Sequence, residues 1–217
     1  MPRLRAALFA PLLLLLPPVV GGAHASVLLS ANLTNSQENP PTVPTTSTFA
    51  PRPASFGTAN FVLNDAMTAM TFTASVFNID FTGTQTADAN DNLAAAHIHA
   101  APTVTPTTNA AVVWGFFGAP FNDNNPNDVV TTPFTNGVGG TISGKWDAPE
   151  GNGTTLTAQL DNILSGHSYI NFHTVQFGGG EIRGQILSVP EPSTLALLGT
   201  GIIGLLGTAL RRRSGRI

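Results

Sequence analysis

Alternation of side chains with a period of two constrains the fold of this chain more than any other feature. Residues 56–63 place small or apolar side chains at every second position, and residues 68–77 do the same. The pair Asn64-Asp65, a good turn sequence, stands between them. A period of two is typical of β-strands, because successive side chains of a strand point to opposite faces. The two segments therefore predict a β-hairpin.

Further segments carry the same signal, in a chain whose threonine, valine and phenylalanine suit a half-buried pleated surface. One short helix is predicted over residues 155–164, because Leu156, Leu160 and Ile163 share one helical face. Strands at short spacing favour an all-β fold, a single β-sandwich or Greek-key barrel-like domain. The other predicted strands are residues 26–34, 94–100, 111–117, 140–146, 168–174 and 181–187, and the predicted loops are 39–53, 83–92 and 122–128. The proline-rich loop 39–53 is expected to be extended and solvated.

The first 25 residues have the three parts of a secretory signal peptide. Arg3 and Arg5 precede an apolar segment with a leucine run at 12–16, and a small-x-small cleavage site follows at Ala23 and Ala25. The alternative is an N-terminal membrane anchor. The apolar run is short and interrupted by prolines, which favours the signal peptide.

The other end of the chain carries a longer apolar run. Residues 193–210 contain no charge over 18 positions, and three arginines follow at 211–213. A helix of this length spans roughly 27 Å at about 1.5 Å per residue, close to the thickness of a bilayer core. The segment is predicted to be a transmembrane helix with the arginines on the cytoplasmic side.

Removing these two ends changes the charge of the chain. Six of the nine basic residues lie in them, so residues 26–192 keep three basic residues against all twelve acidic ones, a formal charge of −9. Such a domain repels nucleic acid and other polyanions. The chain has no cysteine. An exported domain without disulfides depends on its core or on a metal.

The tail as a whole resembles a known sorting signal. Pro190, Glu191 and Pro192 stand directly before the apolar run and the arginines. This order resembles the PEP-CTERM signal of bacterial surface proteins, over residues 189–217. The resemblance implies processing by an exosortase, a membrane transpeptidase-like enzyme. The protein would be anchored transiently in the inner membrane and then sorted to the cell surface or extracellular matrix.

Two blocks in the middle resemble a second family. The first reads A-H-I-H at 96–99, and the second reads G-H-S-Y-I-N-F-H-T at 166–174, followed by G-G-E-I-R-G-Q-I at 179–186. Together with Q-E-N-P-P at 37–41, they resemble the CHRD domain of chordin and many bacterial secreted proteins. The similarity covers residues 26–188. Ala100 departs from the glycine that many members have there. The resemblance implies a β fold and says little about chemistry.

Histidines in these blocks form a candidate metal site for zinc or copper. His97 and His99 are one residue apart on a predicted strand, so both point to one face, and His173 is placed on another strand. Two such histidines can reach one ion, as in copper and zinc β-barrels. Glu181 or Asn171 is expected to hold the second ring nitrogens.

Two other interpretations of the histidines stay open. They could form a metal-free polar network with Asn171, Glu181 and Arg183, or they could lie on an unrelated exposed face. Glu181 and Arg183 could equally form a cross-strand ion pair.

Three other patterns in the sequence suggest or exclude a function. The loop with Asp123, Asn125, Asn127 and Asp128 offers oxygen ligands for calcium, or it is an ordinary Asx-rich turn. The G-x-G-x-x-G match at 199–204 lies inside the apolar tail and follows no strand, so it is not expected to bind a dinucleotide. The chain contains no cysteine, G-x-S-x-G or H-E-x-x-H, so hydrolytic catalysis is not expected.

Two functions are consistent with these sequence features. The first is a non-enzymatic exported module of the envelope or matrix, with an exosortase, the membrane and matrix protein or exopolysaccharide as partners. The second is a metalloprotein of redox or hydrolytic type that uses the three histidines.

Overall fold

The computed structural model describes residues 26–189 and Thr200. The predicted signal peptide, with Ala23 and Ala25, lies outside the described residues. So do Pro190, Glu191 and Pro192, and the predicted transmembrane helix apart from Thr200. Within the described residues, no helix has both the length and the hydropathy needed to cross a membrane.

The described part of the chain is mostly β-structure, as predicted. Ten strands form one hydrogen-bonded sheet in the order β5-β4-β8-β9-β1-β2-β3-β7-β6, with β10 added beside β1. The strands are β1 (Val27–Thr34), β2 (Phe56–Leu63), β3 (Ala69–Phe77), β4 (Leu93–Ala100), β5 (Val112–Phe117), β6 (Val130–Pro133), β7 (Gly139–Asp147), β8 (Ser168–Thr174), β9 (Ile182–Gln185) and β10 (Leu187–Ser188). Two 3-10 helices, η1 (Asn35–Gln37) and η2 (Ala89–Asp91), follow β1 and precede β4.

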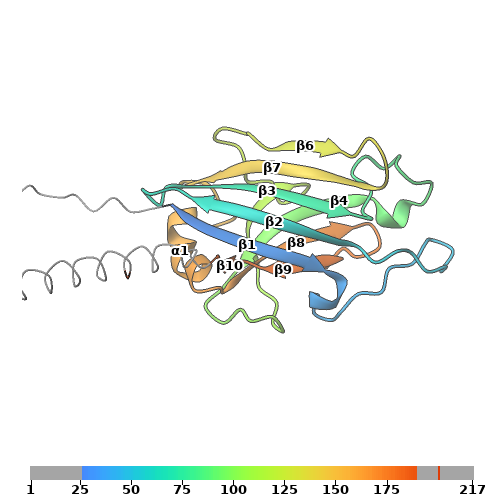
Figure 1. Cartoon of the computed structure of the whole chain (residues 1–217), viewed down its shortest axis with the longest axis horizontal. Coiled ribbons are helices and arrows are strands. Elements are labelled where there is room, and N and C mark those ends of the chain that lie inside the picture. Colours follow the sequence, from blue (N-terminus) through green and yellow to red (C-terminus); the bar gives the residue numbers. More distant parts are fainter. Residues whose placement is uncertain (1–25, 190–199, 201–217) are drawn as a thin grey trace, which may run out of the picture.

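The sheet curls into a half-barrel (Figure 1), so the structure is closer to the barrel-like alternative than to the two-sheet sandwich that the sequence analysis also allowed. Neighbouring strands are hydrogen-bonded along the whole path from β5 to β6, so no break divides them into two sheets. The twist between adjacent strands accumulates over such a path and bends the sheet around its own core.

Predicted strand pairs at two places are confirmed. β2 and β3 form the expected hairpin, paired over their whole length from Phe56↔Phe77 to Leu63↔Met70. β8 and β9 are antiparallel neighbours, and Phe172 lies opposite Ile182. The sequence analysis missed β6. This strand contains Pro133 and pairs only with β7, and an edge is where a sheet tolerates proline.

The core lies inside the curl of the sheet. Trp114 and Trp146 stack there with their ring centroids 5.5 Å apart, and both are fully buried. Phe172 and Ile182 are also fully buried, as the alternation predicted. The α-helix α1 (Leu156–Leu164) packs Leu156 and Ile163 into the same core, and the Thr155 side chain caps it by accepting a hydrogen bond from the Ala158 N–H.

The proline-rich loop differs in part from the prediction. It is largely solvated, but it is not continuously extended. A turn closes between Thr46 and Ala50, whose backbone groups are 2.8 Å apart, and Arg52 turns inward to an ion pair with Glu181 at 2.7 Å. The buried ion pair anchors the loop to the sheet.

Candidate metal centre

The three predicted histidines lie on the adjacent antiparallel strands β4 and β8. His97 is opposite Asn171, His99 is opposite Tyr169, and His173 is opposite Ala95. Their strand neighbours Ile98 and Phe172 belong to the core, so the histidines occupy the opposite face of the sheet. Loops cover that face, and every residue of β8 is buried.

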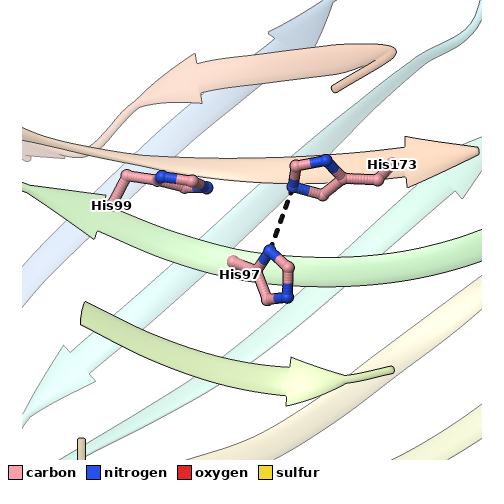
Figure 2. Close-up of side chains that lie close together, drawn as sticks. All are labelled: His97, His99 and His173. Atoms are coloured by element: carbon pink, nitrogen blue, oxygen red, sulfur yellow. Dashed lines mark hydrogen bonds between the residues drawn. The ribbon is translucent and has the colours of Figure 1, made fainter. Parts of the chain in front are cut away.

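The structure brings the three side chains together (Figure 2). One ring nitrogen from each of His97, His99 and His173 lies within 4.8 Å of the other two. The residues are only 4%, 7% and 6% exposed, respectively. No other group of three or more metal-ligating side chains in the described part of the chain lies close enough together to share one ion.

Backbone carbonyl groups hold the outer nitrogen of each ring. His97 Nε2 is 3.1 Å from the Ala119 oxygen, His99 Nδ1 is 2.9 Å from the Ala110 oxygen, and His173 Nδ1 is 3.0 Å from the Gly178 oxygen. This corrects the expectation that Glu181 or Asn171 would fill this role. Carbonyl oxygens serve equally well, because they fix a ring's tautomer and orientation.

These carbonyl contacts assign the protons of the rings. A carbonyl oxygen only accepts, so the outer nitrogen of each ring carries the hydrogen. A neutral imidazole has one N–H, so the inner nitrogen of each ring presents a lone pair. The inner nitrogens of His97 and His173 are 3.0 Å apart, and His99 Nε2 is buried without a hydrogen-bond partner among the described residues. The centre of the cluster thus holds three acceptors and calls for a cation, either a proton or a metal ion.

Burial disfavours the proton. It lowers the pKa of His97 to about 4, and the neighbouring His173 and His99 lower it further, while the contact with Ala119 opposes the change. Burial likewise lowers the pKa of His99 to about 4 and depresses the pKa of His173. At neutral pH the rings are therefore neutral, which is the form that binds metal ions.

Two glycines explain how a loop reaches His97. A side chain at Gly115 would place its Cβ 1.8 Å from the Pro120 oxygen, so glycine lets the chain after β5 fold back over the strand. Gly118 has a φ of +66°, which favours glycine, and its Cβ position lies 2.3 Å from the Ala94 oxygen. The turn brings the Ala119 carbonyl onto the histidine.

The predicted polar-network residues are buried but do not contact the histidine nitrogens. Glu181 binds Arg52 at 2.7 Å and Thr174 at 2.6 Å, and it also accepts a hydrogen bond from Ser55. The Glu181–Arg183 pair considered from the sequence is replaced by the Arg52–Glu181 ion pair.

Arg183 binds the loop between β4 and β5, which lies beside the histidine cluster. It donates to the carbonyl oxygens of Gln37, Pro106 and Thr108, and its guanidinium lies 4.6 Å from the centre of the Tyr169 ring. Tyr169 in turn stacks on His99 with a centroid distance of 4.7 Å. Arg183 thereby fastens the loop whose Ala110 carbonyl holds His99.

Sequence reasoning missed the three carbonyl groups and the stacked tyrosine. Backbone groups carry no sequence signal, so Ala110, Ala119 and Gly178 could not be found. Tyr169 could have been found from the sequence, because alternation places its side chain on the same face of the strand as His173.

The candidate calcium loop is held by its own hydrogen bonds. Asp123 is fully buried, and one of its oxygens accepts from the N–H groups of Asp128 and Val129 at 3.0 and 2.9 Å. Asp128 also pairs with Lys145 at 3.1 Å. These contacts are those of an Asx-rich turn, and calcium binding at Asp123, Asn125, Asn127 and Asp128 stays a prediction.

Comparison with protein families gives two matches. The model of the CHRD domain matches residues 29–186, most of the chain. The chain belongs to the CHRD family. Both predicted histidine blocks fall inside this CHRD domain. The model of the PEP-CTERM protein-sorting motif matches residues 188–213, so this CHRD protein is exported to the cell envelope or surface and its sorting partner is an exosortase. Neither family is an enzymatic one. Searches of curated proteins and of solved structures returned no significant match.

Proposed function

We propose that the CHRD domain of this exported protein is a non-enzymatic binding module of the envelope or matrix that holds one zinc or copper ion. His97 Nδ1, His99 Nε2 and His173 Nε2 are the ligand atoms. The observation that carries the proposal is the inward-facing set of three nitrogen lone pairs, each oriented by a carbonyl group on the far side of its ring.

The chemistry of the donors suits these metals. Imidazole binds zinc and copper well, whereas calcium and magnesium prefer oxygen ligands. The set has three members, so a fourth position on the ion is left for water or for a group of another molecule. Because binding needs neutral rings and two adjacent strands already hold them, the site requires little rearrangement.

A metal-free network is the competing function for the same residues. In that case His97 and His173 would share a proton across their 3.0 Å contact, and the cluster would serve stability alone. The two functions predict opposite results when a histidine is removed. Loss of a ligand abolishes metal binding, whereas loss of a network member leaves buried polar groups without partners.

Metal content of the full-length protein in detergent decides between them. We expect chelator-treated protein to take up about one equivalent of zinc or copper, measured by elemental analysis after desalting. The double variant His97→Ala, His99→Ala is expected to take up none and to keep its fold. His167→Ala is the matched control, because His167 lies outside the cluster and is expected to leave uptake unchanged.

The opposite result would favour the network. Uptake below about a tenth of an equivalent by the wild type would refute the metal site, since structural sites bind zinc tightly. A large loss of stability in the double variant, without any metal bound to the wild type, would then assign the histidines to folding.

A further inference from the structure

A cavity that adjoins the histidine cluster at Gly178 has the composition of a ligand site. Its volume is about 490 Å³, within the range of small-molecule sites. Its lining comes from two stretches far apart in the sequence, residues 38–42 and 176–180, together with Asn109. The segment that follows η1 and the connection between β8 and β9 therefore meet there.

Glu38 is the unusual member of this lining. It is only 6% exposed, and its Oε1 has no hydrogen-bond partner among the described residues. Burial raises the pKa of Glu38 to about 7, although the charge of Arg183 and hydrogen bonds from the Asn39 N–H and the Asn171 amide oppose this. A second acceptor nearby, Asn171 Oδ1, is also buried and unpartnered within the described residues. Buried acceptors without donors are costly, and a ligand hydroxyl would satisfy them.

Around Glu38 the lining combines amides with flat apolar surfaces. Asn39, Asn109 and Gln176 supply donors and acceptors, while Phe177 and the prolines at 40–41 supply apolar faces. No lysine or arginine is among the described residues that line the cavity. The lining therefore offers a negatively charged ligand a carboxyl group and no basic side chain, and the nearby Arg183 is already bound to backbone carbonyl oxygens. Residues 26–192 also carry a formal charge of −9, which disfavours such a ligand.

The amide groups are already held in place. Asn109 donates to the Asn39 carbonyl at 2.8 Å and accepts from Arg183 at 2.8 Å, and Asn39 donates to the Thr107 carbonyl at 2.8 Å. Gly180 has a φ of +125°, and a Cβ there would lie 2.7 Å from Glu38 Oε1. A site whose polar groups are fixed before binding loses less entropy when the ligand enters.

We propose that this cavity binds a neutral sugar unit of a polysaccharide, with Glu38 accepting hydrogen bonds from its hydroxyl groups and Phe177 packing against its ring. Sugar hydroxyls both donate and accept, which matches a lining of one carboxyl and three amides, and the C–H face of a sugar suits an aromatic ring. This deepens the proposed role as an envelope binding module, and it does not depend on the metal.

Isothermal titration of the full-length protein in detergent tests the proposal. The probes are cellotetraose, maltotetraose and N-acetylchitotetraose, each with chelator-treated and with zinc-loaded protein, so that failure of the metal site and failure of the sugar site are seen separately. At least one neutral tetrasaccharide is expected to bind in both forms. Glu38→Gln is expected to weaken binding about tenfold, because the Asn39 N–H and the Asn171 amide would retain the remaining oxygen and turn the amide nitrogen toward the sugar.

Phe177→Ala provides a second variant at a partly exposed position, with an expected loss of about fivefold or more from the missing aromatic face. Asp161→Asn, on the exposed side of α1, is the matched control and is expected to bind normally. Thermal melting checks that each variant is folded. The proposal is overturned by any of three results: no binding of the tetrasaccharides at about 10 mM, equal binding by both cavity variants and wild type, or tighter binding of heparin or of a deacetylated, positively charged chitotetraose.

Discussion

At the scale of single residues, the face of the strand decides the environment of each side chain. Phe172 and His173 are neighbours in β8, yet Phe172 joins the core and His173 joins the histidine cluster on the other face. A shift of one residue in the register would exchange them. Substitution of a single side chain therefore tests the assignment of the faces.

Phe172→Ala is expected to lower the free energy of unfolding by about 3–5 kcal/mol, the usual range for a fully buried phenylalanine. Urea unfolding followed by tryptophan fluorescence measures this, because Trp114 and Trp146 lie in the same core. Phe49→Ala is the matched control. Phe49 is 87% exposed, so a change within about 0.5 kcal/mol is expected. A loss below 1 kcal/mol for Phe172→Ala (about the cost of a single methylene) would contradict the assigned face.

Glu38 is expected to make stability depend on pH. Burial raises the pKa of its carboxyl in the folded protein from the ordinary 4.5 to about 7, so between these values the unfolded chain is ionised while the folded protein keeps the proton. Stability falls as pH rises through this window, by about 3 kcal/mol in total, and is constant above it.

Glu38→Gln removes this dependence. The difference in unfolding free energy between the variant and the wild type is expected to grow in the variant's favour from pH 4.5 to 7. Urea titrations across that range measure it, with Asp161→Asn as an exposed control. A constant difference at every pH would show that Glu38 ionises alike in both states. Comparison with the wild type at each pH cancels the contribution of the histidines.

At the scale of elements, one buried ion pair connects the proline-rich loop to the sheet. The Arg52 and Glu181 side chains are 5% and 0% exposed and lie 2.7 Å apart. Glu181 also accepts from Thr174 in β8, so the carboxylate joins the loop, the strand and the start of β9. The turn in the loop depends on this anchor, because few of its other residues are buried.

Arg52→Met is expected to cost about 3–5 kcal/mol, because it leaves Glu181 charged and buried without its partner. The surface offers a matched comparison in Lys145, which is partly exposed and bridges Asp128 and Asp147 at 3.1 and 3.0 Å. Lys145→Met is expected to cost no more than about 1 kcal/mol. Both values come from urea unfolding. If the two variants were equally stable, the Arg52 pair would contribute no more than a surface pair.

At the scale of the whole molecule, the two ends of the folded domain meet. β10 pairs with the beginning of β1, with Leu29 opposite Ser188, and the Val189 N–H donates to the Leu28 carbonyl at 2.9 Å. The sorting motif begins at residue 188, directly at this junction. Strands β1 to β9 therefore all precede the sorting motif, and Ser188 belongs both to β10 and to the matched segment.

Glu191→Ala is expected to block processing, because Glu191 is the charged residue of the sequence Pro190–Pro192 that stands before the apolar run. The expected result is full-length protein retained in the membrane fraction and little released protein, measured by immunoblot of both fractions. Asp161→Ala, at an exposed position of α1, is the control for loss of an acidic residue elsewhere in the chain. Equal release of wild type and Glu191→Ala would mean that this residue does not direct sorting.

Much of this protein was determined by its sequence alone. The strands and their faces follow from alternation, which is a local property: His97 and His99 share a face whatever the rest of the chain does. The helix at Leu156–Leu164 follows from spacing, and the sorting tail follows from the order of its parts. The convergence of His173 with the other two histidines was a prediction that the geometry supports.

The tertiary structure decided what depends on pairing between distant segments. The strands pair into one half-barrel sheet with β6 at an edge. Glu181 forms its ion pair with Arg52, which is 129 residues away in the chain. The carbonyl groups that orient the histidines and the cavity around Glu38 arise where loops meet the sheet. A backbone carbonyl is the same at every residue, so its partner is set by the path of the chain in space and leaves no mark in the sequence.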